Sequence, residues 1–70
     1  MLKDYQSIYD FIIAHTERTQ EGLIKIVEGG KERFLGGDKL EAYCSRLREM
    51  VERKQVRLFV RDDGVYIMRK

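Results

Sequence analysis

The sequence predicts one small domain of the α+β class, with helices first and a β-hairpin at its carboxyl end. Residues 38–54 (DKLEAYCSRLREMVERK) repeat apolar side chains at the i, i+3, i+4, i+7 spacing of a helix that is covered on one face. Residues 56–69 hold two β-rich runs around the turn sequence DDG, which is the pattern of a hairpin. A chain of 70 residues forms a single small core, so we predict one domain over residues 1–70.

The helix over 38–54 has a marked beginning. Two glycines precede it, Asp38 can accept from the first free backbone N–H groups, and Glu41 stands where a capping box places its second member. Two further helices are predicted before it, near residues 2–18 and 21–28. The first of these has one apolar stripe, which we expect to face the helix over 38–54: Tyr5, Ile8, Tyr9, Ile12, Ile13 and Thr16.

Residues 23–35 fit two structures. LIKIV is apolar at four of five positions and suits a short helix or a buried strand. As a helix, it ends at Gly29-Gly30 and gives three helices followed by a hairpin, which is the arrangement we predict. As an alternative, residues 23–27 and 31–35 form a hairpin through the two glycines, with Glu28 opposite Lys31, and the chain is a helix-hairpin-helix-hairpin (αββαββ) domain.

The residues offer no catalytic or metal-binding pattern. His15 is the only histidine and Cys44 the only cysteine, whereas zinc usually needs three or four converging ligands. Gly29-Gly30-Lys31 lacks the spacing and the hydroxyl residue of a phosphate loop, and no Ser or Cys has an evident base partner. We therefore predict a protein that is not an enzyme and holds no cofactor or metal, and we expect Cys44 to be a small buried apolar residue.

Composition limits the location and the partners. The net charge of +2 is far from the strongly basic balance of a coating protein, so a nucleic-acid site must come from local asymmetry. No apolar run approaches the ~18 residues of a membrane span, and the amino terminus lacks the order of a signal peptide. We expect a cytoplasmic protein that does not enter a membrane.

Two blocks of sequence resemble a known family. YQSIYDFIIAHT at residues 5–16 is similar to the opening helix of winged helix-turn-helix domains, specifically the amino-terminal DNA-binding domains of LexA-type repressors. In LREMVERKQVRL at residues 47–58, Leu47, Met50 and Val56 match the family's recognition-helix end, short turn and first wing strand. The resemblance implies a winged helix that binds double-stranded DNA, with the helix over 38–54 in the major groove and the hairpin as the wing.

The positive residues can be placed on these elements. Lys39, Arg46 and Arg53 recur seven residues apart and form a stripe opposite the apolar face of the helix. Glutamates are interspersed along the same helix, so the stripe is equally consistent with an ordinary solvated face. We predict that the chain is a small DNA-binding transcriptional regulator. The residues predicted to contact DNA are Lys39, Ala42, Arg46, Arg53, Arg57 and Arg61.

A second function class follows from the outer face of the hairpin. Phe59 shares one face of its strand with arginines, and the register of the turn decides whether Tyr66 and Met68 join it. As an alternative function, the chain is a small protein-interaction module that modulates a partner through this face. We also predict a homodimer through Phe59, Tyr66 and Met68, with a free edge strand at 65–69. Stacking of single-stranded nucleic acid needs an open sheet with several exposed aromatics, and the sequence indicates at most two.

Overall fold

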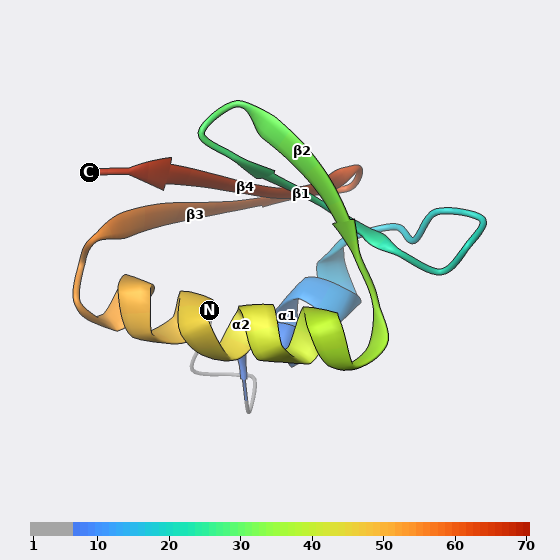
Figure 1. The fold of residues 1–70 in the computed structure, drawn as a ribbon, viewed down its shortest axis with the longest axis horizontal. Coiled ribbons are helices and arrows are strands. Elements are labelled where there is room, and N and C mark those ends of the chain that lie inside the picture. Colours follow the sequence, from blue (N-terminus) through green and yellow to red (C-terminus); the bar gives the residue numbers. More distant parts are fainter. Residues whose placement is uncertain (1–6) are drawn as a thin grey trace.

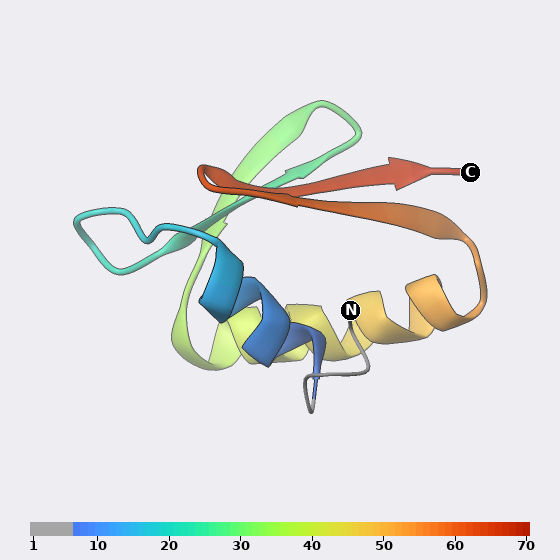
Figure 2. The ribbon, with the colours of Figure 1, turned by 180° about the vertical axis from the view of Figure 1, so that it is seen from behind.

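The computed structural model describes residues 7–70 and confirms an α+β domain. Its elements are α1 (Ile8–His15), β1 (Ile24–Glu28), β2 (Lys31–Leu35), α2 (Gly37–Glu52), β3 (Val56–Arg61) and β4 (Gly64–Arg69). The strands form one sheet in the order β2-β1-β4-β3, in which β1 and β4 are parallel and the other pairs antiparallel. Both helices lie on the same side of this sheet, so its other side is open (Figure 1; Figure 2).

The three-helix arrangement is not found in the described residues. The predicted helix at 21–28 is replaced by β1, so the alternative helix-hairpin-helix-hairpin order is the observed one. Gly29 and Gly30 both have positive φ, 60° and 80°, which is the backbone of a two-residue primed turn, and Glu28 lies opposite Lys31. Ile26 is fully buried because β1 also pairs with β4, far along the chain. That distant pairing selects the strand.

α1 is shorter than predicted. It begins after Ser7, whose hydroxyl oxygen accepts from the Asp10 N–H at 3.2 Å, and it ends at His15 rather than at residue 18. Thr16 closes it by donating its hydroxyl to the Ile12 carbonyl at 2.7 Å. The predicted start at residue 2 and Tyr5 of the apolar stripe lie outside the described residues. Within residues 7–70, neither helix combines the length and the apolar character needed to cross a membrane.

α2 forms close to the predicted bounds of 38–54, but its beginning differs. The N-cap is Gly36, and no side chain caps the helix, so the predicted capping box of Asp38 and Glu41 is wrong. The helix ends in a left-handed turn at Lys54, with φ of 60°, and the Gln55 N–H donates to the Met50 carbonyl at 2.9 Å. This turn sends the chain back across the sheet as β3.

The core lies between the helices and the sheet. α2 supplies Leu40, Tyr43, Cys44 and Leu47, and the other buried residues come from α1 and all four strands: Ile8, Ile12, Ile24, Ile26, Leu35, Val56, Val65 and Ile67. Cys44 is 3% exposed, and burial raises the pKa of its thiol to about 11. The prediction that Cys44 is a small buried apolar residue is confirmed.

Candidate functional site: the open face of the sheet

The candidate site is the side of the sheet that no helix covers. Side chains alternate along each strand, and in β3 Val56, Leu58 and Val60 pack toward the helices. Their neighbours therefore point away from the helices, and the strand registers extend this assignment to the other three strands. We call this surface the open face; its side chains are Lys25, Val27, Glu32, Phe34, Arg57, Phe59, Arg61, Tyr66 and Met68.

An apolar row crosses the centre of the open face. Tyr66 lies opposite Phe59 of β3 on one side and Val27 of β1 on the other. The arginines of β3, Arg57 and Arg61, lie two residues before and two residues after Phe59 on the same side of the strand. Two neighbouring aromatic rings are therefore bordered by a guanidinium group at each end.

The exposed large apolar residues of the described chain all lie on this face. Met68 is 57% exposed, Phe34 48% and Phe59 41%. Phe59 and Met68 lie on the adjacent strands β3 and β4, whereas Phe34 lies on the edge strand β2, opposite Lys25. Exposed apolar side chains that neighbour one another mark a binding surface, because monomeric proteins rarely leave large apolar patches in water. The open face is therefore the strongest candidate for a functional surface.

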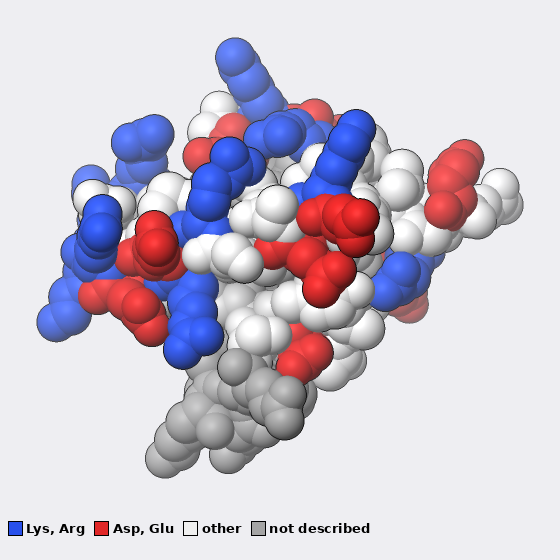
Figure 3. Space-filling model, turned by 60° about the horizontal axis from the view of Figure 1, so that its bottom comes forward, with Lys and Arg blue, Asp and Glu red and all other residues white. Residues whose placement is uncertain are grey.

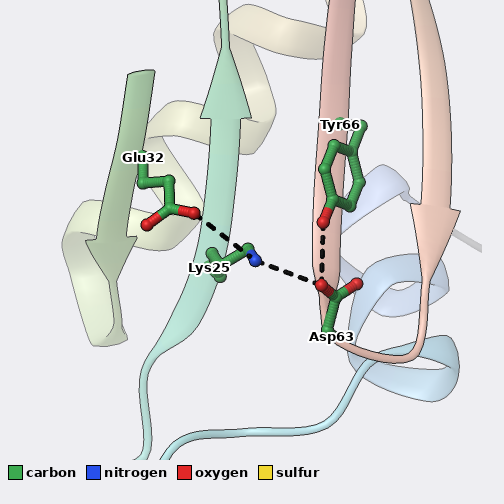
Figure 4. Close-up of polar contacts among 4 residues, drawn as sticks. All are labelled: Lys25, Glu32, Asp63 and Tyr66. Carbon is green, nitrogen blue, oxygen red and sulfur yellow. Dashed lines mark hydrogen bonds and ion pairs between the residues drawn. The ribbon is translucent and has the colours of Figure 1, made fainter. Parts of the chain in front are cut away.

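Hydrogen bonds and ion pairs connect the β3–β4 turn to β1. Asp63 accepts from the Tyr66 hydroxyl at 2.7 Å and from the Lys25 ammonium at 3.1 Å, and Lys25 also lies 3.6 Å from a carboxylate oxygen of Glu32 (Figure 4). Lys25 is thus compensated by two carboxylates. Within residues 7–70, Arg57 and Arg61 form no ion pair, so the uncompensated positive charge of the open face lies on β3.

Cations also surround the Tyr66 ring. The Arg61 guanidinium carbon lies 5.5 Å from the ring centroid and the Lys25 nitrogen 5.6 Å from it. Both distances are within the range of a cation–π interaction, which draws the long Arg61 side chain over the sheet. This holds the charge of Arg61 beside the aromatic row.

The pKa shifts of Asp63 and Lys25 predict a pH window. The Tyr66 hydroxyl and then Lys25 hold the pKa of Asp63 below its ordinary 3.8, and the hydrogen bond to Asp63 raises the pKa of Lys25 to about 12 from 10.5. The lowered carboxyl pKa stabilises the fold above 3.8, and that stabilisation is lost as pH falls through the lowered value. The raised ammonium pKa stabilises the fold below 10.5, and that stabilisation is lost as pH rises through about 12.

Asp63→Asn tests this window. Its deficit in the free energy of unfolding, measured by urea denaturation against the wild type, is expected to be constant from about pH 5 to about pH 9 and to shrink on either side. Asp62→Asn is the control, because Asp62 is the exposed neighbour in the same turn and has no ion pair among the described residues. A deficit that stays the same down to about pH 2 contradicts the assignment.

A hollow lies at one end of the open face. Its volume is about 520 Å³, and most of its lining comes from β4 and the β1–β2 turn: Val27, Gly29, Gly30, Phe59, Arg61, Tyr66, Ile67, Met68 and Arg69. The two glycines carry no side chain, so the hollow is open toward that end of the sheet. A flat ring placed there can contact Phe59 and Tyr66.

The predicted DNA-binding residues fall on two sides of the molecule. Lys39, Ala42 and Arg46 of α2, and Arg53 at its C-cap, are exposed on the helix side, where basic and acidic side chains are mixed (Figure 3). Arg57 and Arg61 are exposed on the open face, on the other side of the sheet. The structure therefore does not bring the helix and the hairpin together as one surface for a duplex.

The predicted dimer residues, in contrast, are brought together. Phe59 lies opposite Tyr66 and Arg57 opposite Met68, which settles the hairpin register that the sequence left open. The predicted free edge at 65–69 is wrong, because β4 is an inner strand between β1 and β3. The edges of the sheet are β2 and β3.

Sequence reasoning missed the half of the site that comes from β1 and β2. Lys25 and Val27 fall in the predicted helix over 21–28 and Phe34 follows it, so only the alternation of the hairpin alternative places the three on one face. For metal chemistry, residues 7–70 contain no group of three or more His, Cys, Asp or Glu side chains that could hold an ion. The absence of enzymatic activity stays a prediction.

A scan against protein-family models and searches of curated proteins and of solved structures found no match to this chain. The resemblance to winged helix-turn-helix domains therefore stays a prediction. The function has to be argued from the open face itself.

Proposed function

We propose that this chain binds single-stranded nucleic acid on the open face of its sheet. The observation that carries the proposal is the exposed ring of Phe59, with Arg57 and Arg61 on either side of it along β3 and with Tyr66, whose ring Arg61 approaches, beside it on β4. Unstacked bases bind aromatic rings through their flat faces, and guanidinium groups bind the phosphates between them. A single strand offers both groups at once.

The open sheet supports a single strand over the predicted duplex. Bases inside a duplex are stacked on each other, so their faces cannot reach Phe59 or Tyr66. A third aromatic side chain, Phe34, lies on the same face and is 48% exposed. The face is thus an open sheet with two exposed aromatic rings, Phe59 and Phe34, and with the half-buried Tyr66 beside Phe59, while β1 separates Phe34 from that pair.

Substitutions at Phe59 test the proposal. Fluorescence anisotropy of an oligo(dT) of about four nucleotides at about 50 mM salt is expected to show binding by the wild type. Phe59→Leu is expected to weaken it about tenfold or more, because stacking contributes ~1–3 kcal/mol per base, whereas Phe59→Tyr keeps the ring and the affinity. Circular dichroism verifies that both variants are folded.

Two results would overturn the proposal. The first is an absence of wild-type binding at this salt concentration, and the second is wild-type affinity in Phe59→Leu, which lacks the ring but keeps the apolar volume.

The same exposed apolar residues favour a second candidate, a protein-interaction module, with the homodimer as its simplest form. A twofold contact centred on Phe59 sets Arg57 of one copy near Arg61 of the other. Like charges opposed in an interface are costly, and this places the homodimer second. Sedimentation equilibrium at tens of micromolar separates the two candidates: a dimer that Phe59→Ser dissociates, together with no oligonucleotide binding, supports the second.

A further inference from the structure

We infer that a bound single strand leaves the open face over the Gly29-Gly30 turn and continues along a row of basic residues on the helix side. We call these residues the basic track: Lys31, Arg33, Arg46 and Arg69. The inference rests on the proposed function and extends it, because it names the course of the strand and a second group of contacts that the aromatic face does not contain.

Contiguous hollows define this course. The hollow of the open face shares Gly29 and Arg69 with a second one of about 470 Å³, which is also lined by Lys31 and Arg33. This second hollow shares Glu28 and Arg33 with a third of about 420 Å³ that reaches Arg46 on α2. The three hollows therefore adjoin one another around one end of the sheet, from the aromatic row to α2, and we call their succession the groove.

The charges along this course favour an anionic chain. Within the described residues, no carboxylate forms an ion pair with any of the four cations of the basic track. Arg33 and Arg46 both approach the Tyr43 ring, with guanidinium carbons 5.6 Å and 6.0 Å from its centroid, so one aromatic residue holds two arginines beside the same groove. A single strand carries a phosphate at every nucleotide, so it can contact several such cations in turn.

Two acidic residues, Glu28 and Glu49, also line the groove, and one of them accepts a hydrogen bond from within the protein. Glu28 accepts from the Tyr43 hydroxyl at 2.8 Å, and burial together with this bond raises the pKa of Tyr43, which keeps the hydroxyl protonated as a donor. Glu49 lines the third hollow beside Arg46. Four cations therefore face two carboxylates.

Arg46 was predicted from the sequence as a DNA contact, and the groove gives it a role without a duplex. The other predicted contacts on or next to this helix, Lys39, Ala42 and the C-cap Arg53, line none of these three hollows. Of the predicted DNA contacts on the helix side, Arg46 is therefore the one that lines the groove.

A length series tests the inference. Oligo(dT) strands of about four and about twelve nucleotides are titrated into the wild type, Arg33→Gln and Arg46→Gln, since single-strand sites span ~4–16 nucleotides. The control is Arg48→Gln, because Arg48 lies on α2 beside the hollow that faces α1, away from the basic track. Oligo(U) strands of the same lengths are expected to give the same ranking, because stacking and phosphate contacts are common to RNA and DNA.

The wild type is expected to bind the longer strand more tightly. Each of the two track variants is expected to lower the salt dependence of log K for the longer strand by about 0.7, the value for one phosphate contact in a single strand, and to leave the short strand unchanged. Arg48→Gln is expected to change neither. Circular dichroism of Arg33→Gln verifies that losing its contact with Tyr43 does not unfold the domain.

The outcomes separate this inference from the proposed function. If the short strand binds and depends on Phe59, but Arg33→Gln and Arg46→Gln behave as the wild type on the longer strand, the basic track is wrong and the open face stands. If neither strand binds, both ideas are overturned. In a competition experiment, poly-glutamate can be compared with unlabelled oligo(dT). If both displace the longer strand equally well, the groove binds acidic polypeptides and the inference is overturned.

Discussion

Replacing Gly64 with alanine is expected to destabilise the domain by about 3 kcal/mol or more. Gly64 begins β4 with φ of 153°, and a Cβ built there lies 2.5 Å from the Lys25 carbonyl oxygen and 2.9 Å from the Lys25 Cβ. The oxygen belongs to the backbone of β1 and cannot rotate away. Backbone strain of ~1–3 kcal/mol and overpacking of ~1–3 kcal/mol therefore combine.

The position of this contact makes the effect global. β1 and β4 form the pairing that joins the two hairpins into one sheet, so any shift that relieves the clash also weakens that pairing. Urea denaturation followed by circular dichroism measures the loss, with Gly30→Ala as the matched control. Gly30 also has a positive φ, 80°, but a Cβ there meets no atom within 4 Å. Equal losses in the two variants would show that the close approach of β4 to β1 is wrong.

Leu47→Ala is expected to cost about 2–5 kcal/mol of the free energy of unfolding, the usual range for a buried leucine. Leu47 is 0% exposed and belongs to the core cluster between α2 and the sheet. A domain of this size has a total stability of roughly 4–10 kcal/mol, at ~0.05–0.15 kcal/mol per residue. A large fraction of the variant is therefore expected to be unfolded at 37 °C. Thermal unfolding followed by circular dichroism measures this fraction.

Met50→Ala is the matched control for Leu47→Ala. Met50 is a side chain of similar volume on the same helix, but it is only partly buried at the border of the core. Its replacement is expected to cost clearly less, because fewer contacts are lost and the gap is open to water. A loss as large as that of Leu47→Ala would mean that α2 is rotated about its axis relative to the described packing.

Elements whose signals are local could be predicted from the order of residues alone. The apolar period of α2 predicted one covered face made of Leu40, Tyr43, Cys44, Leu47, Met50 and Val51. The first four are buried, and Met50 and Val51 are partly buried against the core. The hairpin of β3 and β4 followed from two β-rich runs around a three-residue turn sequence, and alternation placed Phe59 between outward arginines. These features depend on residues that are close together in the sequence, so they form without contacts to distant parts of the chain.

The secondary structure of residues 24–35, and with it the candidate site, depends on contacts that form only in the folded chain. LIKIV suits a helix or a strand locally, and it becomes a strand because β1 pairs in parallel with β4, Ile26 opposite Val65. Neither hairpin shows in its own sequence which edge will join the other. That choice merges two separate hairpins into one sheet, places Val27 beside Tyr66 and Phe59, and puts Arg57 and Arg46 on opposite sides. The open face exists because of a pairing between residues about forty positions apart, which short-range periodicity does not record.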